Sequence, residues 1–548
     1  MIAAPGHGES ARLSGVAATP TSPDSVETGT AGRSQLSPPV RLPRSEVVAV
    51  IGVTCLGLVL CLIDLGSRSL WLDEFYSAFL ARFPGRSLWH AITSDGGNFM
   101  AYYALLRAWV IGFGWGPTVL RLPSALAGAG LVPVVFSLGR RAGGPRVGLV
   151  ACLLAAVSPP LVVWSQQARG YSMAVFAVSL TWLMAVRLQD CRTLARYGVF
   201  CVLAIISTYV QLTASLVVAA ALAWLYLASR DGKAKAKVVA CMAFYLLCCL
   251  PLVLIVQAEG FARRATASVG WVAPPGWASA RFLLSELVSG SVPDFFRSRL
   301  ENAMLSVVFL LCWTAALVML LLVRRRRGSA GGESVIAEIA AGFVFWLVVP
   351  VVLDWIVSVG SGYSIFEPSF LLSVVPAGLL LAAYGLANLR LRLARLAGTA
   401  VFVALSLAVL VPTYGASSEN WKGAVAFVLV AAHPGDCVAF DAPSGVREFA
   451  YYVNEAQEDR ASLEPIFPRQ TWSQALAASV PYSLRQDYTS SAVSGVRRSC
   501  KRIWMVVNRP RADLGFAEAE VAYTLGSTYR KTALHGFAGI TVDLIVKR

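Results

Sequence analysis

Apolar stretches long enough to cross a lipid bilayer recur along most of this chain. They occupy residues 47–63, 119–138, 147–164, 172–186, 197–229, 238–256, 302–323, 335–358, 370–388 and 397–413. A membrane-crossing helix needs about 20 mostly apolar residues, and the stretch 197–229 is long enough for two such helices. Of the 548 residues only 14% are charged, whereas a soluble domain carries about a quarter. The sequence therefore predicts a polytopic α-helical membrane protein with about eleven transmembrane helices.

The basic residues indicate how these helices are oriented. The formal net charge of +16 is a property shared with nucleic-acid-binding proteins. The bases lie, however, in short loops between apolar stretches, as at Arg140, Arg141 and the run from Arg324 to Arg327. Basic loops of this kind stay on the cytoplasmic side of a membrane. We therefore expect a multi-pass protein of the inner (plasma) membrane, with its N-terminus in the cytoplasm and no nucleic-acid partner.

The segments outside the apolar stretches divide the chain into three parts. Residues 1–44 are rich in Pro, Gly, Ser and Thr, which predicts a disordered cytoplasmic tail. Residues 45–414 form the membrane module, with outer loops at 67–117 and 258–300. The first of these loops contains an apolar stretch at 101–115. A crossing there would move every later basic loop to the outside, so we predict interfacial helices instead.

The last part, residues 415–548, is predicted to be an extracytoplasmic α/β domain. Candidate helices at 420–432, 445–456 and 512–525 alternate with candidate strands at 436–441, 502–508 and 539–546. Cys437 and Cys500 both lie in this part. An exported pair of cysteines can form a disulfide, but spacing along the sequence does not establish that the two residues meet.

Two adjacent carboxylates, Asp73 and Glu74, follow the first apolar stretch in a chain that uses acids sparingly. Such a pair at the start of an outer loop fits chemistry at the membrane surface, since perturbed carboxylates cluster at functional sites. A solvated loop start is the alternative interpretation. The residues around the pair bear on this choice.

Four sequence blocks, in this order, resemble a known family of membrane enzymes. The blocks are Ser-Leu-Trp-Leu-Asp-Glu at 69–74, Asn-Phe-Met-Ala-Tyr-Tyr at 98–103, Leu-Arg-Leu-Pro at 120–123 and Ser-Gln-Gln-Ala-Arg-Gly-Tyr at 165–171. The set is similar to the GT-C glycosyltransferases of the family-39 and aminoarabinose-transferase type, which include protein O-mannosyltransferases. The resemblance is strongest over residues 65–175 and continues more weakly to about residue 390.

This resemblance implies a fold and a reaction. We expect a GT-C type bundle that moves a sugar from a polyprenyl-phosphate donor to an acceptor hydroxyl on the outer face of the membrane, with inversion. The first acid of the outer loop is the general base in the family, a role that carries to Asp73, with Glu74 in support. The chemistry agrees, because a weak hydroxyl nucleophile gains from a nearby carboxylate, whereas a leaving phosphate needs no acid.

Cationic donors are expected for that phosphate, since arginine forms forked hydrogen bonds to phosphate oxygens. Arg169 is the first candidate and Arg121 the second. Relatives often carry a Pro-Arg-Tyr block where this chain has Glu367-Pro368-Ser369-Phe370. That departure leaves two alternatives: Arg263 or Arg264 binds the phosphate, or the donor differs from that of the relatives. The remaining residues expected in the substrate cavity are Asn98, Tyr102, Tyr103, Gln167, Tyr171 and Trp271.

Several alternatives stay open at this point. Mannose is the first-choice sugar and an arabinose-type sugar the second, and the acceptor is a glycolipid, a polysaccharide or a protein. The chain lacks some acid and imidazole residues of metal-binding relatives, so we expect no dedicated metal site. A divalent metal held by Asp73, Glu74 and substrate phosphate remains an alternative. The competing functions are a lipid or solute transporter, or a degenerate family member that only binds a partner.

Overall fold

A computed structural model describes most of the chain. The described residues are 43–94, 96–258, 272–290, 299–325, 331–440, 445–456, 463–467, 471–477, 500–508 and 529–548. Residues Met1–Pro43 and Arg44–Arg548 form two separate units. The predicted N-terminal tail therefore lies almost wholly outside the described residues. Everything below concerns the second unit.

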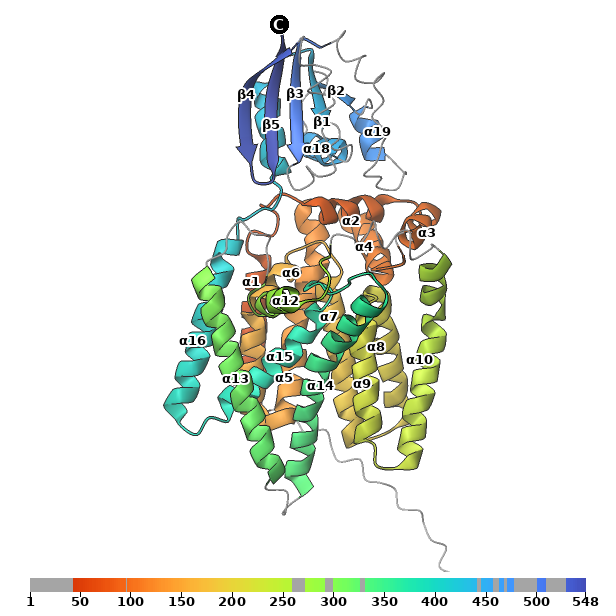
Figure 1. The fold of residues 1–548 in the computed structure, drawn as a ribbon, viewed down its shortest axis with the longest axis vertical. Helices are drawn as coiled ribbons and strands as arrows, with labels where there is room; N and C mark the ends of the chain where they lie inside the picture. The colour runs from red at the N-terminus through yellow and green to blue at the C-terminus, as the bar shows by residue number, and fades with distance from the viewer. Residues whose placement is uncertain are drawn as a thin grey trace, which may run out of the picture. The chain divides into compact units, whose positions relative to one another are not determined.

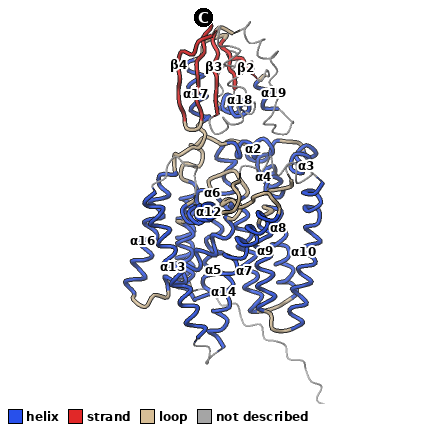
Figure 2. Tube along the Cα trace, in the orientation of Figure 1, coloured by secondary structure: helices blue, strands red, loops and turns tan. Residues whose placement is uncertain are grey.

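Helices make up the larger part of this unit (Figures 1 and 2). Those before residue 260 are α1 (Arg44–Leu62), α2 (Leu72–Arg82), α3 (Gly85–Ser94), α4 (Met100–Phe113), α5 (Pro117–Ala156), α6 (Pro159–Ser165), α7 (Tyr171–Asp190), α8 (Leu194–Val210), α9 (Ala214–Ala228) and α10 (Gly232–Ala258). Those that follow, up to residue 413, are α12 (Trp277–Ser289), α13 (Arg299–Arg325), α14 (Gly331–Gly360), the 3-10 turn η1 (Leu372–Val374), α15 (Val375–Ala387), α16 (Arg392–Leu410) and the turn η2 (Val411–Thr413).

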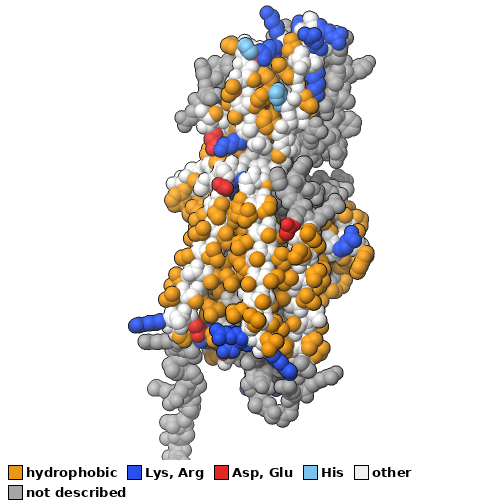
Figure 3. Space-filling model, turned by 90° about the vertical axis from the view of Figure 1, so that its left-hand side faces the viewer, with side chains coloured by type: hydrophobic (Ala, Val, Ile, Leu, Met, Phe, Trp, Pro, Cys, Tyr) orange, Lys and Arg blue, Asp and Glu red, His pale blue; other side chains and the backbone are white. Residues whose placement is uncertain are grey.

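Within the described residues, 7 helices are long and apolar enough to cross a membrane. They are α1, α5, α7, α10, α13, α14 and α16. Most of the apolar stretch of α5 and of α7 is buried, whereas only a small share of that of α1, α10 and α16 is buried. Hydrophobic side chains cover the helical part in Figure 3, and Lys and Arg gather at its lower edge. These features confirm the predicted polytopic helical membrane protein.

The predicted count of about eleven spans is not confirmed. The stretches at 197–229 and 370–388 form the shorter apolar helices α8, α9 and α15, which fall below the length of the other spans. The stretch at 101–115 is also a short apolar helix, α4. The place of α4 at a membrane interface stays a prediction.

Helix α5 contains a chain reversal at the basic loop that the sequence predicts between two spans. Gly143 and Gly144 have non-helical backbone angles, and the positive φ of 80° at Gly144 is a conformation that favours glycine. Gly139 and Gly148 lie against each other, because a Cβ on Gly139 would meet the Cα of Gly148 at 3.0 Å. The two arms therefore form a hairpin, and the predicted span 147–164 is divided between the second arm and α6.

The C-terminal sheet region consists of five strands with the helices α17 (Trp421–Ala431), α18 (Gly445–Glu455) and α19 (Trp472–Ala477). Its strands are β1 (Asp436–Phe440), β2 (Leu463–Phe467), β3 (Arg502–Asn508), β4 (Tyr529–Phe537) and β5 (Ile540–Lys547), in the order β2-β1-β3-β5-β4. Strands β1, β2 and β3 are parallel, and β3, β5 and β4 are antiparallel. Figure 2 shows strands only in this region of the described chain.

Three of the strands and two of the helices correspond to the segments predicted from the sequence. The predicted helix at 512–525 lies outside the described residues, and the boundaries of a separate outer domain stay a prediction. Cys437 on β1 and Cys500 just before β3 are joined by a disulfide. The neighbouring parallel strands β1 and β3 bring the two cysteines together, a pairing that the sequence alone left open.

Helix α18 connects the sheet region to the helices near the candidate site. The ring of Phe75 on α2 lies edge-on to the rings of Tyr451 and Tyr452, with centroids 5.5 and 6.0 Å away. The Tyr451 hydroxyl donates a hydrogen bond to the Trp115 carbonyl at 2.9 Å. The sheet region therefore packs directly on α2, the helix that carries the paired acids.

Candidate active site

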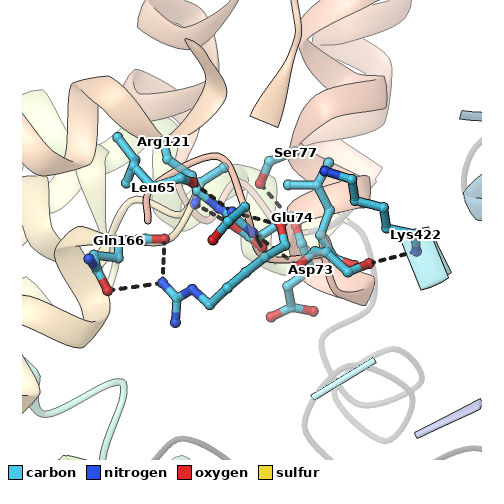
Figure 4. A network of polar contacts seen from close by, with 12 residues as sticks. Leu65, Asp73, Glu74, Ser77, Arg121, Gln166 and Lys422 are labelled. Carbon is cyan, nitrogen blue, oxygen red and sulfur yellow. Dashed lines mark hydrogen bonds and ion pairs between the residues drawn. The ribbon is translucent and has the colours of Figure 1, made fainter. Parts of the chain in front are cut away.

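The paired acids stand in the first turn of α2. The Trp71 carbonyl accepts hydrogen bonds from the amides of Glu74 and Phe75, which starts the helix at Leu72. Acidic side chains are favourable here because the first turn of a helix carries partial positive charge. Consecutive positions on a helix point in different directions. In Figure 4 the Asp73 side chain points away from the network that surrounds Glu74.

Glu74 forms a buried ion pair with Arg121 on α5. The Glu74 side chain is 1% exposed and the Arg121 side chain 2%. Arg121 donates from Nε and Nη2 to the two carboxylate oxygens, both at 2.7 Å. The Ala168 amide donates to Glu74 Oε1 at 2.8 Å. Glu74 thus joins α2, α5 and the loop before α7.

Arg121 was also predicted to bind the donor phosphate, and this geometry does not support that role. Its remaining N–H groups donate to the carbonyls of Leu65, Arg68 and Ser69 at 2.8, 3.0 and 3.1 Å. An arginine has five N–H donors, and all of them are used within the protein. Arg121 instead holds the segment before α2 and the carboxylate of Glu74, and it offers no donor to a ligand.

Asp73 pairs with Arg169, the first-choice phosphate ligand. Arg169 Nη2 lies 3.3 Å from Asp73 Oδ2, and the Asp73 side chain is 32% exposed. Arg169 Nη1 donates to the Tyr103 hydroxyl at 3.0 Å. The Ser124 hydroxyl on α5 donates to the Arg169 carbonyl at 3.0 Å, which fixes the loop between α6 and α7. An accessible carboxylate therefore lies beside an arginine held by the protein.

The surroundings of Arg169 preserve its charge. Burial acts to lower the pKa of Arg169, but the Asp73 carboxylate and the hydroxyls of Tyr103 and Tyr171 outweigh it and raise the pKa above its ordinary value. The guanidinium also lies over the Phe99 ring, 4.8 Å from the centroid. Aromatic faces attract cations. The site thus keeps a fixed positive charge beside a carboxylate.

Three buried polar atoms around this pair have no hydrogen-bond partner in the structure: Arg169 Nε, Gln167 Oε1 and the Tyr102 hydroxyl. Burying an unsatisfied polar group costs about 1–3 kcal/mol. Buried polar atoms without partners are suited to binding a polar ligand, and the Asp73 carboxylate that pairs with Arg169 is partly exposed. Tyr102, Tyr103, Gln167 and Tyr171 were all predicted for the cavity, and the structure brings them close to Arg169.

Asn98 has a different place. Its Oδ1 accepts hydrogen bonds from the Leu212 amide at 3.2 Å and from the Phe99 amide at 3.1 Å. It therefore connects the loop before α4 to the turn between α8 and α9. Trp271, Arg263 and Arg264 lie outside the described residues, so their predicted roles stay predictions.

The loop between α14 and η1 also reaches the site. Ser369 on this loop lies near the Tyr171 side chain, and Tyr171 lies beside Arg169, whose guanidinium is 5.7 Å from the Tyr171 ring centroid. Two residues earlier, burial raises the pKa of Glu367 to about 7. This is the loop in which relatives often carry Pro-Arg-Tyr. Here it brings a hydroxyl and a partly buried acid instead of a cation.

Several residues that build the site are not among those predicted from the sequence. Arg68 is buried and donates to Gln166 Oε1 at 3.0 Å, and Gln166 Nε2 donates to the Ile63 carbonyl at 2.8 Å. The Tyr452 hydroxyl accepts a hydrogen bond from the Leu70 amide at 2.7 Å. Arg68 could have been noticed as a charge between an apolar stretch and the acid pair. No sequence signal pointed to Tyr452, which is remote along the chain.

A divalent metal held by both acids does not fit these residues. Both Glu74 oxygens already accept charge-assisted bonds from Arg121, and one also accepts the Ala168 amide. Metal binding at Glu74 would place the ion against the buried Arg121 cation. Among the described residues there is also no cluster of three or more His, Cys, Asp or Glu side chains able to hold an ion.

Part of the chain matches a known protein family. Residues 99–255, which include Arg169 and the cavity residues of α4, match the family described as "Dolichyl-phosphate-mannose-protein mannosyltransferase". No curated protein matches the sequence. The fold is similar to that of ArnT from Cupriavidus metallidurans in the apo state, with a TM-score of 0.52 at 14% identity over 91% of this chain and 98% of that one.

A second ArnT structure from the same organism, bound to undecaprenyl phosphate, has a TM-score of 0.53 at 13% identity and covers 92% of this chain and 98% of that one. The likeness thus extends over the membrane helices and the C-terminal sheet region together. The matched segment and the shared fold show that this chain resembles the GT-C glycosyltransferases of the protein O-mannosyltransferase and ArnT type.

Proposed function

We propose that this protein transfers a sugar from a polyprenyl-phosphate donor to an acceptor hydroxyl, with Asp73 as general base. The observation that carries the proposal is the pairing of an accessible Asp73 carboxylate with Arg169, 3.3 Å apart, beside buried polar atoms that lack partners. One group can take a proton and the other can stabilise an anion. Glycosyl transfer from a phosphate ester needs both functions.

The proposed reaction is a single displacement. The acceptor oxygen forms a bond to the anomeric carbon while the bond from that carbon to the phosphate oxygen breaks. Asp73 accepts the hydroxyl proton, and the phosphate leaves as an anion with the electron pair of the broken bond. Attack from the face opposite the phosphate inverts the anomeric carbon. A preorganised cation such as Arg169 lowers the barrier where this charge develops.

The donor class is supported by the related proteins. One ArnT structure with this fold binds undecaprenyl phosphate, and the matched family is described by a dolichyl-phosphate-mannose reaction. A lipid-linked donor is therefore the proposed substrate class, with mannose as the first sugar to test and an arabinose-type sugar as the second. The proposed acceptor is a glycolipid, a polysaccharide or a protein hydroxyl.

The proposed location is the inner membrane, with Asp73 and the C-terminal sheet region on the outer side. Basic loops between the apolar stretches support this orientation through the positive-inside rule. A donor with a polyprenyl chain would enter from the bilayer, and the acceptor would approach Asp73 from the aqueous side.

The test is transfer of radiolabelled sugar by the purified full-length protein in lipid. The donor is polyprenyl-phosphate mannose, the acceptor a membrane-lipid extract, and Asp73→Asn is compared with wild type. The variant keeps the side-chain shape but removes the base, so we expect turnover to fall by about 10²-fold or more. Equal turnover by a well-folded Asp73→Asn protein would refute the assignment of the base. Absence of transfer from every carrier-linked sugar would refute the proposed function.

A further inference from the structure

The segment between α1 and α2 is held by hydrogen bonds along its whole length. Arg121 donates hydrogen bonds to the carbonyls of Leu65, Arg68 and Ser69. The Arg68 side chain in turn donates to the Gln166 side chain. All these contacts come from helices and loops of the membrane module. Figure 4 shows Arg121 and Gln166 on one side of the segment and Lys422 on the other. Lys422 lies on α17, a helix of the C-terminal sheet region.

The sheet region supplies two hydrogen bonds to this segment. The Leu70 amide donates to the Tyr452 hydroxyl at 2.7 Å, across 382 positions of sequence. The Lys422 amide donates to the Ser69 hydroxyl at 3.3 Å, across 353 positions. Leu70 is the second residue before α2, and Asp73 is the second residue of that helix. These bonds therefore act at the point where the direction of α2 is set.

The Tyr452 contact is shielded from water. Leu70 is 0% exposed and Tyr452 is 3% exposed. The ring of Tyr452 packs edge-on against Phe75, one turn into α2. Burial raises the pKa of the Tyr452 hydroxyl to about 12, so the group stays neutral at physiological pH. Without that hydroxyl, the Leu70 amide would lose its hydrogen-bond acceptor, and because the amide is buried, water could not take the place of the hydroxyl.

We infer that Tyr452 is a positioning residue for Asp73: its hydroxyl fixes the Leu70 amide and thereby the start of the helix that carries the base. The C-terminal sheet region is then a structural part of the active site. Tyr452 touches neither reactant in this scheme and acts through the backbone of α2. The inference rests on the proposed glycosyl transfer, because Asp73 is the group whose position is controlled.

The test compares two tyrosines of the same helix. Tyr452→Phe removes the hydroxyl and keeps the ring packed on Phe75. We expect kcat to fall about tenfold or more, since a displacement of about 1 Å near a reacting group can cost about a hundredfold. KM for the lipid donor should stay within about twofold. Hydrogen–deuterium exchange at the Leu70 amide should rise in the same variant.

Tyr451→Phe is the matched control. Its hydroxyl bonds the Trp115 carbonyl after α4 rather than the segment before α2. We expect it to leave both kcat and Leu70 exchange close to wild type. Ser69→Ala removes the acceptor of the Lys422 amide from the other side of the contact. Because Ser69 precedes Leu70 and this is the second hydrogen bond between the sheet region and the segment, Ser69→Ala should lower kcat and raise Leu70 exchange, and it tests the role of the sheet region even if Tyr452→Phe folds poorly.

The outcomes separate the two proposals. Normal turnover by Tyr452→Phe with raised Leu70 exchange would overturn the positioning role and leave the glycosyltransferase intact. Equal loss of kcat in Tyr451→Phe and Tyr452→Phe would also overturn it, because it would indicate a general packing defect. If wild type transfers no sugar from any lipid carrier, the proposed function fails first, and the positioning role fails with it.

Discussion

Arg121 and Arg169 each pair with one of the two adjacent acids of α2, but they differ in what remains available to a ligand. Arg121 uses all its donors within the protein and is buried with Glu74. Arg169 pairs with a partly exposed Asp73, and its Nε has no partner in the structure. The charge of Arg121 therefore stabilises the structure, whereas the charge of Arg169, we propose, takes part in the chemistry.

This difference predicts the behaviour of Arg169→Ala. The substitution removes the cation beside the proposed leaving phosphate, so we expect kcat/KM for the donor to fall about 10²- to 10³-fold. The folded state should persist. Arg169→Lys should recover part of the loss, because it restores the charge without the planar fork. Initial rates over a series of donor concentrations measure the effect.

Two control variants complete that experiment. Arg141→Ala removes an exposed ion pair with Asp190, on a loop predicted to be cytoplasmic, and should leave transfer unchanged. Arg121→Ala leaves Glu74 buried without its partner and should cost about 3–5 kcal/mol of stability. Donor kinetics of Arg169→Ala that match those of Arg141→Ala would place the phosphate site elsewhere.

At the scale of helices, close contacts between backbones decide how the bundle packs. Gly385 on α15 lies against α13, where a Cβ would meet the Cys312 carbonyl oxygen and lie 3.1 Å from the Ala316 amide nitrogen. Neither of those atoms belongs to a flexible side chain. A residue larger than glycine therefore forces the two helices apart.

We accordingly expect Gly385→Ala to destabilise the protein by about 1–3 kcal/mol, the usual cost of overpacking. Gly198→Ala provides the comparison, because Gly198 is on α8 and a Cβ there meets nothing within 4 Å. That change should be neutral or slightly stabilising, since alanine is the better helix former. Thermal unfolding of both variants in detergent gives the difference. Equal midpoints would show that α13 and α15 can separate without cost.

At the scale of the whole chain, two kinds of structure meet at α2. Apolar helices form the membrane module, and a five-stranded sheet with its helices packs on α2 through Tyr451 and Tyr452. The disulfide between Cys437 and Cys500 closes a loop of 63 positions within the sheet region. Restricting the unfolded chain in this way stabilises the folded state.

Replacing both Cys437 and Cys500 by serine should therefore lower stability by about 2–4 kcal/mol. The measurement is the thermal unfolding midpoint with and without reductant, which should differ for wild type and coincide for the double variant. Cys55→Ser is the matched control, because Cys55 is an exposed free cysteine on α1. A wild-type unfolding midpoint that is the same with and without reductant would contradict the prediction.

Much of the fold follows from local properties of the sequence. Apolar runs mark the membrane helices because a bilayer demands about 20 apolar residues in succession. The alternation of candidate helices and candidate strands, with turn residues between them, predicted β1, β3 and β5. Local sequence did not predict the lengths of the shorter helices α8, α9 and α15, nor the division of the stretch 147–164. Those lengths depend on how neighbouring helices pack.

By itself, the sequence determined that this is a helical membrane protein with paired acids after its first span and a resemblance to GT-C glycosyltransferases. Only the tertiary structure decided the partners of those acids. Arg121 and Arg169 are both arginines at predicted outer ends of spans, and local pattern cannot tell which one is saturated by backbone carbonyls. Nor can it bring Tyr452 to Leu70, because contacts between residues far apart in sequence are set by the packing of whole elements.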